Sequence, residues 1–225
     1  MAEPTAMNTG PRLMPIDATL ITLTQWLSPS FPVGAFAYSH GLAAAIAEGW
    51  IQDGPDLQAW LRDVLVVGSG RCDAIWLRLA AQTEDLARLT AEGLAFAPSF
   101  ERRLEAERQG AAFVRSVNAV WGMDLPDLML PVAVGAACAR QGVDIELAVP
   151  LYLHGMLSNL VAAAQRLMPL GQTEAQGVLA ALQADIEAVT EATRGAGLEG
   201  LSSHAFLSDI AAMRHERQEP RVFQS

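Results

Sequence analysis

Apolar residues recur every three or four positions along almost the whole chain, and glycine or proline interrupts this pattern at short intervals. Leu57, Leu61 and Val64 form one such series, and Leu182 and Ile186 belong to another. This spacing gathers the apolar side chains on one face of a helix. No segment alternates apolar and polar residues as a half-buried strand does, and no tight-turn dipeptide joins two such segments. The pattern predicts an all-α protein.

The interruptions divide the 225 residues into about eight to ten helices, which fit a single-domain helical bundle. Asp17 and Asp53 are expected N-caps, and Thr173 with Gln176 matches a capping box. Pro150 is expected to kink its helix or to mark its beginning. We expect helices over residues 17–27, 38–48, 54–67, 73–82, 83–93, 98–120, 126–140, 144–168, 173–189 and 201–213.

The same pattern divides the chain into three regions. Residues 1–16 show no periodicity and are expected to form a flexible N-terminal lead. Residues 17–210 carry the helical pattern and are expected to form the all-α domain. Residues 211–225 end in the polar sequence RHERQEPRVFQS, which we expect to be a C-terminal partner-binding tail.

The charge balance excludes several classes of function. The net charge is −10, whereas proteins that bind nucleic acid carry a basic surface, so we expect no nucleic-acid partner. All 15 basic residues are arginine. Without lysine the chain can form no Schiff base and has no phosphate-loop lysine. If a nucleotide is hydrolysed, a partner must supply the machinery.

We expect a cytoplasmic protein without a membrane span. The N-terminus has no basic start followed by an apolar run, so no signal peptide is visible. The uncharged stretch 147–165 is long enough to cross a membrane, but it contains Pro150 and His154, which favours a buried core helix. Cys72 and Cys138 form no CxxC pair, so neither a zinc ribbon nor a disulfide framework is indicated.

Motifs for catalysis or cofactor binding are weak. Residues 195–200 match GxGxxG, but they follow a predicted helix rather than a strand, which favours a turn between helices. No two histidines have the i, i+4 spacing of a helical metal site. Ser39 and His40 are adjacent without a nucleophile elbow, so nucleophilic catalysis is not indicated. We therefore predict no catalytic residue, no metal ligand and no bound cofactor.

One alternative is a stand-alone helical enzyme or ligand-binding bundle. It would need polar side chains that converge on a core pocket. His154, Ser158 and Asn159 on one apolar helix are the candidates. For His154 alone, a hydrogen-bonded core residue is the simpler interpretation.

Two segments suggest contact with a partner. In SPSFPVGAFAYSHGL, the aromatic residues Phe31, Phe36 and Tyr38 lie on a loop that prolines and a glycine fix. Near the end of the chain, three arginines precede Val222 and Phe223, which is the composition of interface hot spots. A buried connector and a frayed terminus are the respective alternatives.

Four stretches together resemble the UreF family of urease accessory proteins. The first is the loop just quoted, and the others are ERRLEAERQG at 101–110, NLVAAAQRLMPLGQTEAQ at 159–176 and AAMRHERQEPRVFQS at 211–225. They follow the family's order and span almost the whole chain. Arg217 and Glu219 depart from the threonine and tyrosine that the family usually has, and His40 stands where glutamine is common.

The resemblance implies an all-helical homodimer without enzymatic activity. Proteins of this family bind the accessory protein UreD, also called UreH, and the GTPase UreG. The assembly docks on apo-urease and assists lysine carbamylation and nickel insertion. Nickel and GTP would then be handled by the partners rather than by this chain. An alternative within the same system is a GTPase-activating protein that inserts an arginine in trans, with Arg214, Arg217 and Arg221 as candidates.

The loop and the tail supply the expected partner-binding residues. In the family the tail becomes ordered on binding UreD, and the arginine of its arg–x–phe segment, here Arg221, supports recruitment of UreG. We expect Arg221 to contact a carboxylate on the partner and Phe223 to fill a pocket. The full expected set is Phe31, Pro32, Gly34, Phe36, Tyr38, Ser39, Arg214, His215, Arg217, Arg221 and Phe223.

Overall fold

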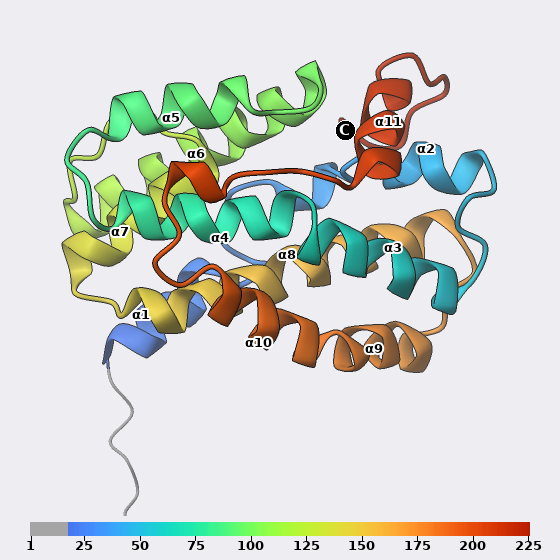
Figure 1. Cartoon of the computed structure of the whole chain (residues 1–225), viewed down its shortest axis with the longest axis horizontal. Helices are drawn as coiled ribbons and strands as arrows, with labels where there is room; N and C mark the ends of the chain where they lie inside the picture. The colour runs from blue at the N-terminus through green and yellow to red at the C-terminus, as the bar shows by residue number, and fades with distance from the viewer. Residues whose placement is uncertain (1–17) are drawn as a thin grey trace, which may run out of the picture.

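The computed structural model describes residues 18–225, which form eleven α-helices, two short 3-10 helices and no strand (Figure 1). The all-α prediction is confirmed. The expected lead 1–16 and the expected cap Asp17 lie outside the described residues. The helices are α1 (Ala18–Trp26), η1 (Ala35–Ala37), α2 (Leu42–Ala47), α3 (Gly54–Val66), α4 (Ser69–Ala80), α5 (Leu86–Ala95), α6 (Phe100–Trp121), α7 (Leu130–Gln141), α8 (Ile145–Leu167), α9 (Gln172–Ala181), α10 (Gln183–Ala192), η2 (Leu198–Gly200) and α11 (Phe206–His215).

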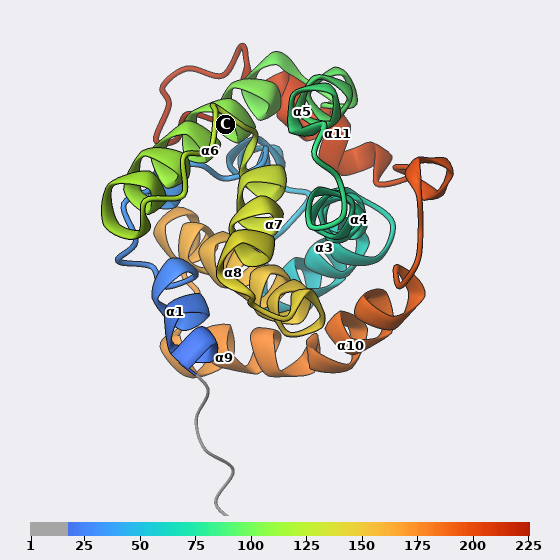
Figure 2. The same ribbon diagram turned by 90° about the vertical axis from the view of Figure 1, so that its left-hand side faces the viewer.

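Helices α7 and α8 lie in the centre, and the other helices surround them (Figure 2). Eight residues of α7 and nine of α8 are buried, because their apolar positions cover most of the helix surface. Helix α8 is long and apolar enough to cross a membrane, but half of its most apolar stretch is buried in the fold. The prediction of a core helix is therefore confirmed.

Side chains cap the starts of four helices, α3, α5, α6 and α8. Asp53 accepts a hydrogen bond from the Asp56 amide at 3.0 Å, and Ser99 accepts one from the Arg102 amide at 3.2 Å. The capping box at Thr173 was wrong, because Gly171 is the N-cap and Thr173 lies inside α9.

Several boundaries differ from the expected ones. Pro150 lies inside α8 and does not mark its beginning. Helix α2 is shorter than expected because His40 and Gly41 before it adopt positive φ angles. The helix expected over 173–189 is two helices, α9 and α10, which are separated at Leu182. The GxGxxG segment contains η2 and joins α10 to α11, as the turn interpretation predicted.

A buried arginine fastens three helices together. Arg78 on α4 donates from Nε and Nη2 to the two carboxylate oxygens of Glu146 on α8, at 3.0 and 2.8 Å. It also donates to the Thr193 hydroxyl at 2.6 Å and to the Thr190 carbonyl at 2.9 Å, at the end of α10. The planar guanidinium supplies all these donors at fixed angles, which lysine could not do.

Candidate functional site

The aromatic loop between α1 and α2 folds back onto the core through its first and last aromatic residues. Phe31 and Tyr38 are buried, and the Phe31 ring lies 5.4 Å from the ring of Phe113 on α6. Phe36 is 72% exposed, so the loop buries two aromatic residues and displays the third. The alternative of a wholly buried connector does not describe this loop.

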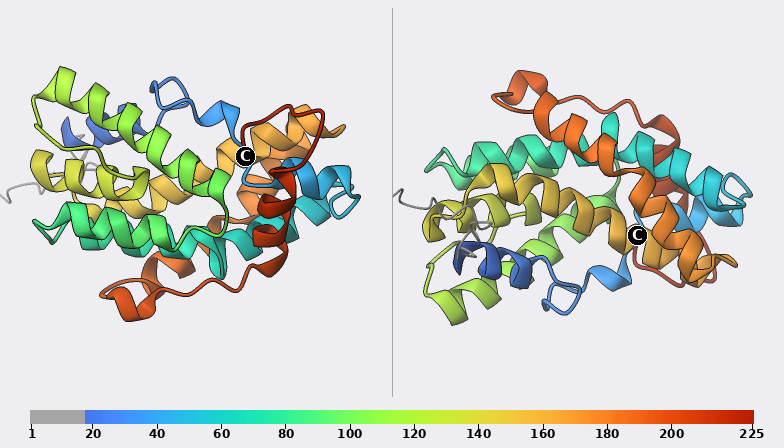
Figure 3. Two further views of the ribbon diagram at one scale, coloured as in Figure 1. Left: turned by 90° about the horizontal axis from the view of Figure 1, so that it is seen from above. Right: turned by 90° about the horizontal axis from the view of Figure 1, so that it is seen from below.

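The tail pairs with this loop through the main chain. The Gln224 amide donates to the Ala37 carbonyl at 2.8 Å, and the Ser39 amide donates to the Ser225 carbonyl at 2.8 Å. The end of the chain accordingly lies beside the segment that joins α1 to α2 (Figure 3). We call residues 31–41 and 216–225 together the loop–tail unit.

A cation–π contact also helps to hold the tail against the loop. Phe223 is buried, and the guanidinium carbon of Arg166 on α8 lies 4.3 Å from its ring centre. Arg166 also donates to the Phe36 carbonyl at 2.7 Å. One arginine thus holds the loop and the tail at once. In the chain alone the tail is packed, and the frayed-terminus alternative does not describe it.

The first turn of α6 anchors the beginning of the tail. Glu101 contacts His215 Nδ1 through one carboxylate oxygen and Arg221 Nη1 through the other, both at 2.6 Å. The Glu216 carboxylate accepts a hydrogen bond from the Phe100 amide at 2.8 Å. A negative group at this position also complements the positive end of the helix dipole.

Glu105, one turn further along α6, is buried among four polar partners. Its Oε1 lies 2.9 Å from His40 Nε2 and accepts from Gln109 Nε2 at 3.0 Å. Its Oε2 accepts from the Ser225 hydroxyl at 2.6 Å and pairs with Arg102. Burial alone would raise the pKa of Glu105, but Arg102 and His40 hold it at about 2.

Burial and Arg102 lower the pKa of His40, so the imidazole is neutral at pH 7. Because Nε2 faces a carboxylate, we assign the ring proton to Nε2. His40 thereby donates to Glu105 without carrying a charge.

The three arginines of the tail region have different partners. Arg214 pairs with Glu48 and lies 5.0 Å from the Trp50 ring centre. Arg221 uses its guanidinium on Glu101 and on two backbone carbonyls of the tail. Arg217 is exposed, and within residues 18–225 its side chain makes no ion pair or hydrogen bond.

The expected site residues therefore come together but divide into two groups. Phe31, Tyr38, Ser39, His215 and Phe223 are buried within this chain. The exposed group is Pro32, Phe36, Arg214, Arg217 and Arg221, and Gly34 is half-buried.

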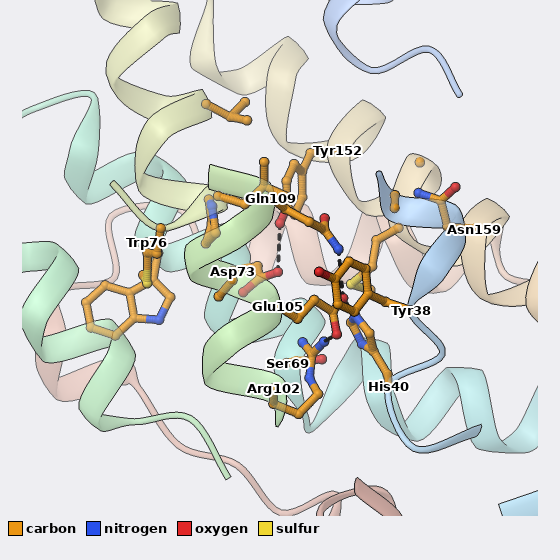
Figure 4. A pocket seen from close by; sticks show the side chains of 18 of the residues that line it. Tyr38, His40, Ser69, Asp73, Trp76, Arg102, Glu105, Gln109, Tyr152 and Asn159 are labelled. Carbon is orange, nitrogen blue, oxygen red and sulfur yellow. Dashed lines mark hydrogen bonds and ion pairs between the residues drawn. The ribbon is translucent and has the colours of Figure 1, made fainter. Parts of the chain in front are cut away.

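A cavity of about 740 Å³ adjoins the loop (Figure 4). Besides Tyr38 and Glu105, its walls include Asp73 on α4 and Tyr152 on α8, whose hydroxyl donates to Asp73 at 2.9 Å. Burial raises the pKa of Asp73 to about 6. Sequence analysis missed this pair, because no spacing links two residues that are 79 positions apart.

The polar residues expected on α8 are only part of this cavity. His154, Ser158 and Asn159 line it, with His154 Nδ1 at 3.5 Å from the Ser158 hydroxyl. His154 is exposed, so the prediction of a buried core histidine was wrong. Among the described residues no group of three or more histidine, cysteine or acidic side chains could hold a metal ion.

Gly41 lies where the last helix meets the loop. Its φ angle is +78°, and a Cβ atom there would come within 2.4 Å of the Ala212 backbone nitrogen on α11. Gly34 has a similar φ of +75°, but a Cβ there would meet nothing within 4 Å. A substitution at either glycine would strain the backbone, because both have positive φ angles. Only a substitution at Gly41 would also clash with α11.

We predict that Gly41→Ala destabilises the protein more than Gly34→Ala. Both variants should lose about 1 kcal/mol of unfolding free energy, because alanine is strained in the left-handed backbone conformation. Gly41→Ala should lose about 1 to 3 kcal/mol more of this free energy, because α11 must move away to make room for the added methyl group. Urea unfolding of the two variants measures the difference, and equal losses would show that α11 does not depend on this contact.

We also predict that Asp73→Asn stabilises the protein near neutral pH. The folded-state pKa is above the unfolded one, so this carboxyl favours folding at low pH, and that contribution is lost between about pH 4 and 6. The amide keeps an acceptor for Tyr152 and has no charge to bury. We expect a gain of about 2 to 3 kcal/mol at pH 7.5 that vanishes near pH 4.

Urea unfolding at both pH values tests this expectation. Asp63→Asn on the exposed side of α3 is the matched control, since it removes the same charge away from the cavity. A loss of stability at pH 7.5, or an equal change at both pH values, would contradict it.

Comparison with known proteins identifies the family. A model of the UreF family matches residues 51–183. Urease accessory protein UreF of Cereibacter sphaeroides strain KD131 is 49% identical over 93% of this chain and 100% of its own length. The UreF proteins of Roseobacter denitrificans and Rhodopseudomonas palustris strain BisB5 are 48% and 42% identical, over 97% and 93% of this chain and 99% and 92% of their own lengths. The chain belongs to the UreF family of urease accessory proteins.

Proposed function

We propose that this chain is a non-enzymatic scaffold of urease maturation. It binds UreD, also called UreH, and the GTPase UreG, and the assembly docks on apo-urease. There it assists lysine carbamylation and nickel insertion and modulates GTP hydrolysis by UreG. The chain acts as a cytoplasmic homodimer, without nucleic-acid or membrane partners and without a cofactor of its own.

The loop–tail unit is the observation that carries this proposal. Its interior is buried and hydrogen-bonded, whereas Phe36 and Val222 beside the paired residues are 72% and 71% exposed. The neighbouring helix α11 adds the exposed side chains of Phe206, Ile210 and Met213. Exposed apolar side chains on a rigid support are typical of protein interaction sites.

The proposal assigns different roles to the buried and exposed residues. Tyr38, Ser39 and Phe223 hold the unit in shape, and Phe36 and Arg217 contact the partner directly. Arg221 acts first within the chain, since its three donor nitrogens hold the tail in its turn. A contact from Arg221 to a partner carboxylate would need this arrangement to open.

We expect Arg221→Ala to weaken recruitment of UreG while the chain keeps its fold and its dimer. The variant removes three hydrogen-bond donors from the tail but no apolar core. Size-exclusion chromatography with light scattering on co-expressed UreD, this chain and UreG provides the measurement. Arg103→Ala is the control, because Arg103 is an exposed arginine of α6 whose side chain pairs with Glu107 on the same helix.

An unchanged three-protein complex with Arg221→Ala would refute this role for the tail. If the unaltered chain forms no complex with UreD and UreG, the assignment of partners fails. The full chain is preferable to a truncation, because removal of 211–225 would also uncover the site of Phe223.

The second candidate is a direct GTPase-activating role, and the unpaired state of Arg217 favours it. Arg217 could enter a partner's active site without breaking a contact among the described residues. If it does, Arg217→Ala should lower the stimulated GTP hydrolysis by about 1,000-fold or more while binding persists. Multiple-turnover hydrolysis by UreG in the complex measures this, and a scaffold predicts no such loss.

A further inference from the structure

Glu105 is the one described residue of α6 whose carboxylate holds both parts of the loop–tail unit. His40 of the loop contacts Oε1 at 2.9 Å, and Ser225 of the tail donates to Oε2 at 2.6 Å. Gln109 and Arg102 share these two oxygens from the helix side. Figure 4 shows the carboxylate between Arg102 and His40 at the wall of the cavity.

We propose that Glu105 is a positioning residue that couples the loop to the tail, so that each segment is fully ordered only when the other is in place. The meaning of this coupling for assembly rests on the proposed function. The coupling itself is a property of the isolated chain.

Burial makes the coupling strong. Glu105 is 4% exposed while both segments are in place, so its contacts with His40 and Ser225 lie in a low-dielectric interior, where electrostatic interactions are strong. If the tail detaches, Oε2 loses the Ser225 hydroxyl, and the Ser39 amide loses its acceptor on the same residue. A hydrogen bond to a buried charge contributes more than an ordinary one, and the Ser39 amide of the loop loses its acceptor at the same time, so departure of the tail weakens the hold on the loop.

Glu101 provides the internal comparison. It is also a buried carboxylate of α6, one turn earlier, but both its oxygens contact residues at the start of the tail. Among the described residues no hydrogen bond or ion pair joins the Glu101 side chain to residues 31–41. Glu101 should therefore anchor the tail alone.

Linkage makes the coupling reciprocal. If order in the loop stabilises the tail, order in the tail stabilises the loop by the same factor. A protein that binds the loop would then prepare the tail for a second protein, although the two contact different residues. This gives the scaffold a physical means to make its binding events ordered.

Amide hydrogen exchange of the full chain, followed by NMR, tests the proposal without any partner. The Tyr38 amide, which donates to the Ala35 carbonyl, reports on the loop, and the Gln218 amide, which donates to the His215 carbonyl, reports on the tail, because neither bond crosses from one segment to the other. We expect Glu105→Gln to speed exchange at both amides by about tenfold or more. An amide side chain has one acceptor oxygen and cannot accept at both ends.

Two further variants are the controls. Glu101→Gln should speed exchange at Gln218 far more than at Tyr38, and Glu107→Gln, whose carboxylate pairs with Arg103, should change neither. Buried amides of α8 should exchange as before in all three, which separates coupling from general loss of stability. Acceleration of one reporter alone by Glu105→Gln, or of neither, would overturn the proposal.

A double-mutant cycle replaces this test if Glu105→Gln does not fold. His40→Ala removes the loop contact and Ser225→Ala removes the tail hydroxyl, so each variant removes one end. Coupling predicts that His40→Ala accelerates exchange of the Gln218 amide and that the effects of the two variants are not additive. Additive effects confined to the altered segment would refute it, whatever the result of the assembly experiment with UreD and UreG.

Discussion

Two buried carboxylates on the first turns of α6 determine where the ends of this fold meet. Glu101 and Glu105 have four oxygens, and every one has a partner that lies on the loop, in the tail region or on α6 itself. A buried anion requires such partners, since its desolvation is costly. The exposed surface that we assign to partner binding is supported from beneath by this pair of anions.

Two of the acidic residues that line the same cavity, Asp73 and Glu105, have pKa values shifted in opposite directions. Burial governs Asp73, whose single hydrogen-bond donor is Tyr152, and raises its pKa to about 6. Glu105 is 4% exposed, yet Arg102, His40 and Ser225 bring its pKa to about 2. The donors and charges around each carboxylate, rather than its burial alone, therefore decide the direction in which its pKa moves.

Local chemistry made much of the fold predictable. Asp53 and Ser99 cap helices because the capping hydrogen bond forms within three residues, and the core helix α8 follows from its composition. The prediction of a capping box at Thr173 failed because capping depends on the backbone conformation of the residue before the helix, which a sequence motif does not determine. The prediction of a buried His154 failed because apolar neighbours in the sequence do not decide which face of a helix is buried.

The candidate site was predictable as two segments but not as one unit. Proline, glycine and aromatic residues marked the loop, and arginines with an aromatic residue marked the tail. Their pairing depends on contacts such as Ser39 with Ser225, for which the sequence offers no periodic signal. Glu101 and Glu105 belonged to a segment whose charge pattern is equally typical of a solvent-exposed helix.

The length of chain between the paired segments has a consequence during biosynthesis. Ser39 and Ser225 are separated by 186 residues, so the junction cannot close until the last part of the domain has left the ribosome. At typical rates of synthesis the loop waits roughly 10 to 40 s for the tail. A nascent chain that has not yet exposed Ser225, or one truncated before it, would therefore lack the paired surface on which the proposed assembly depends.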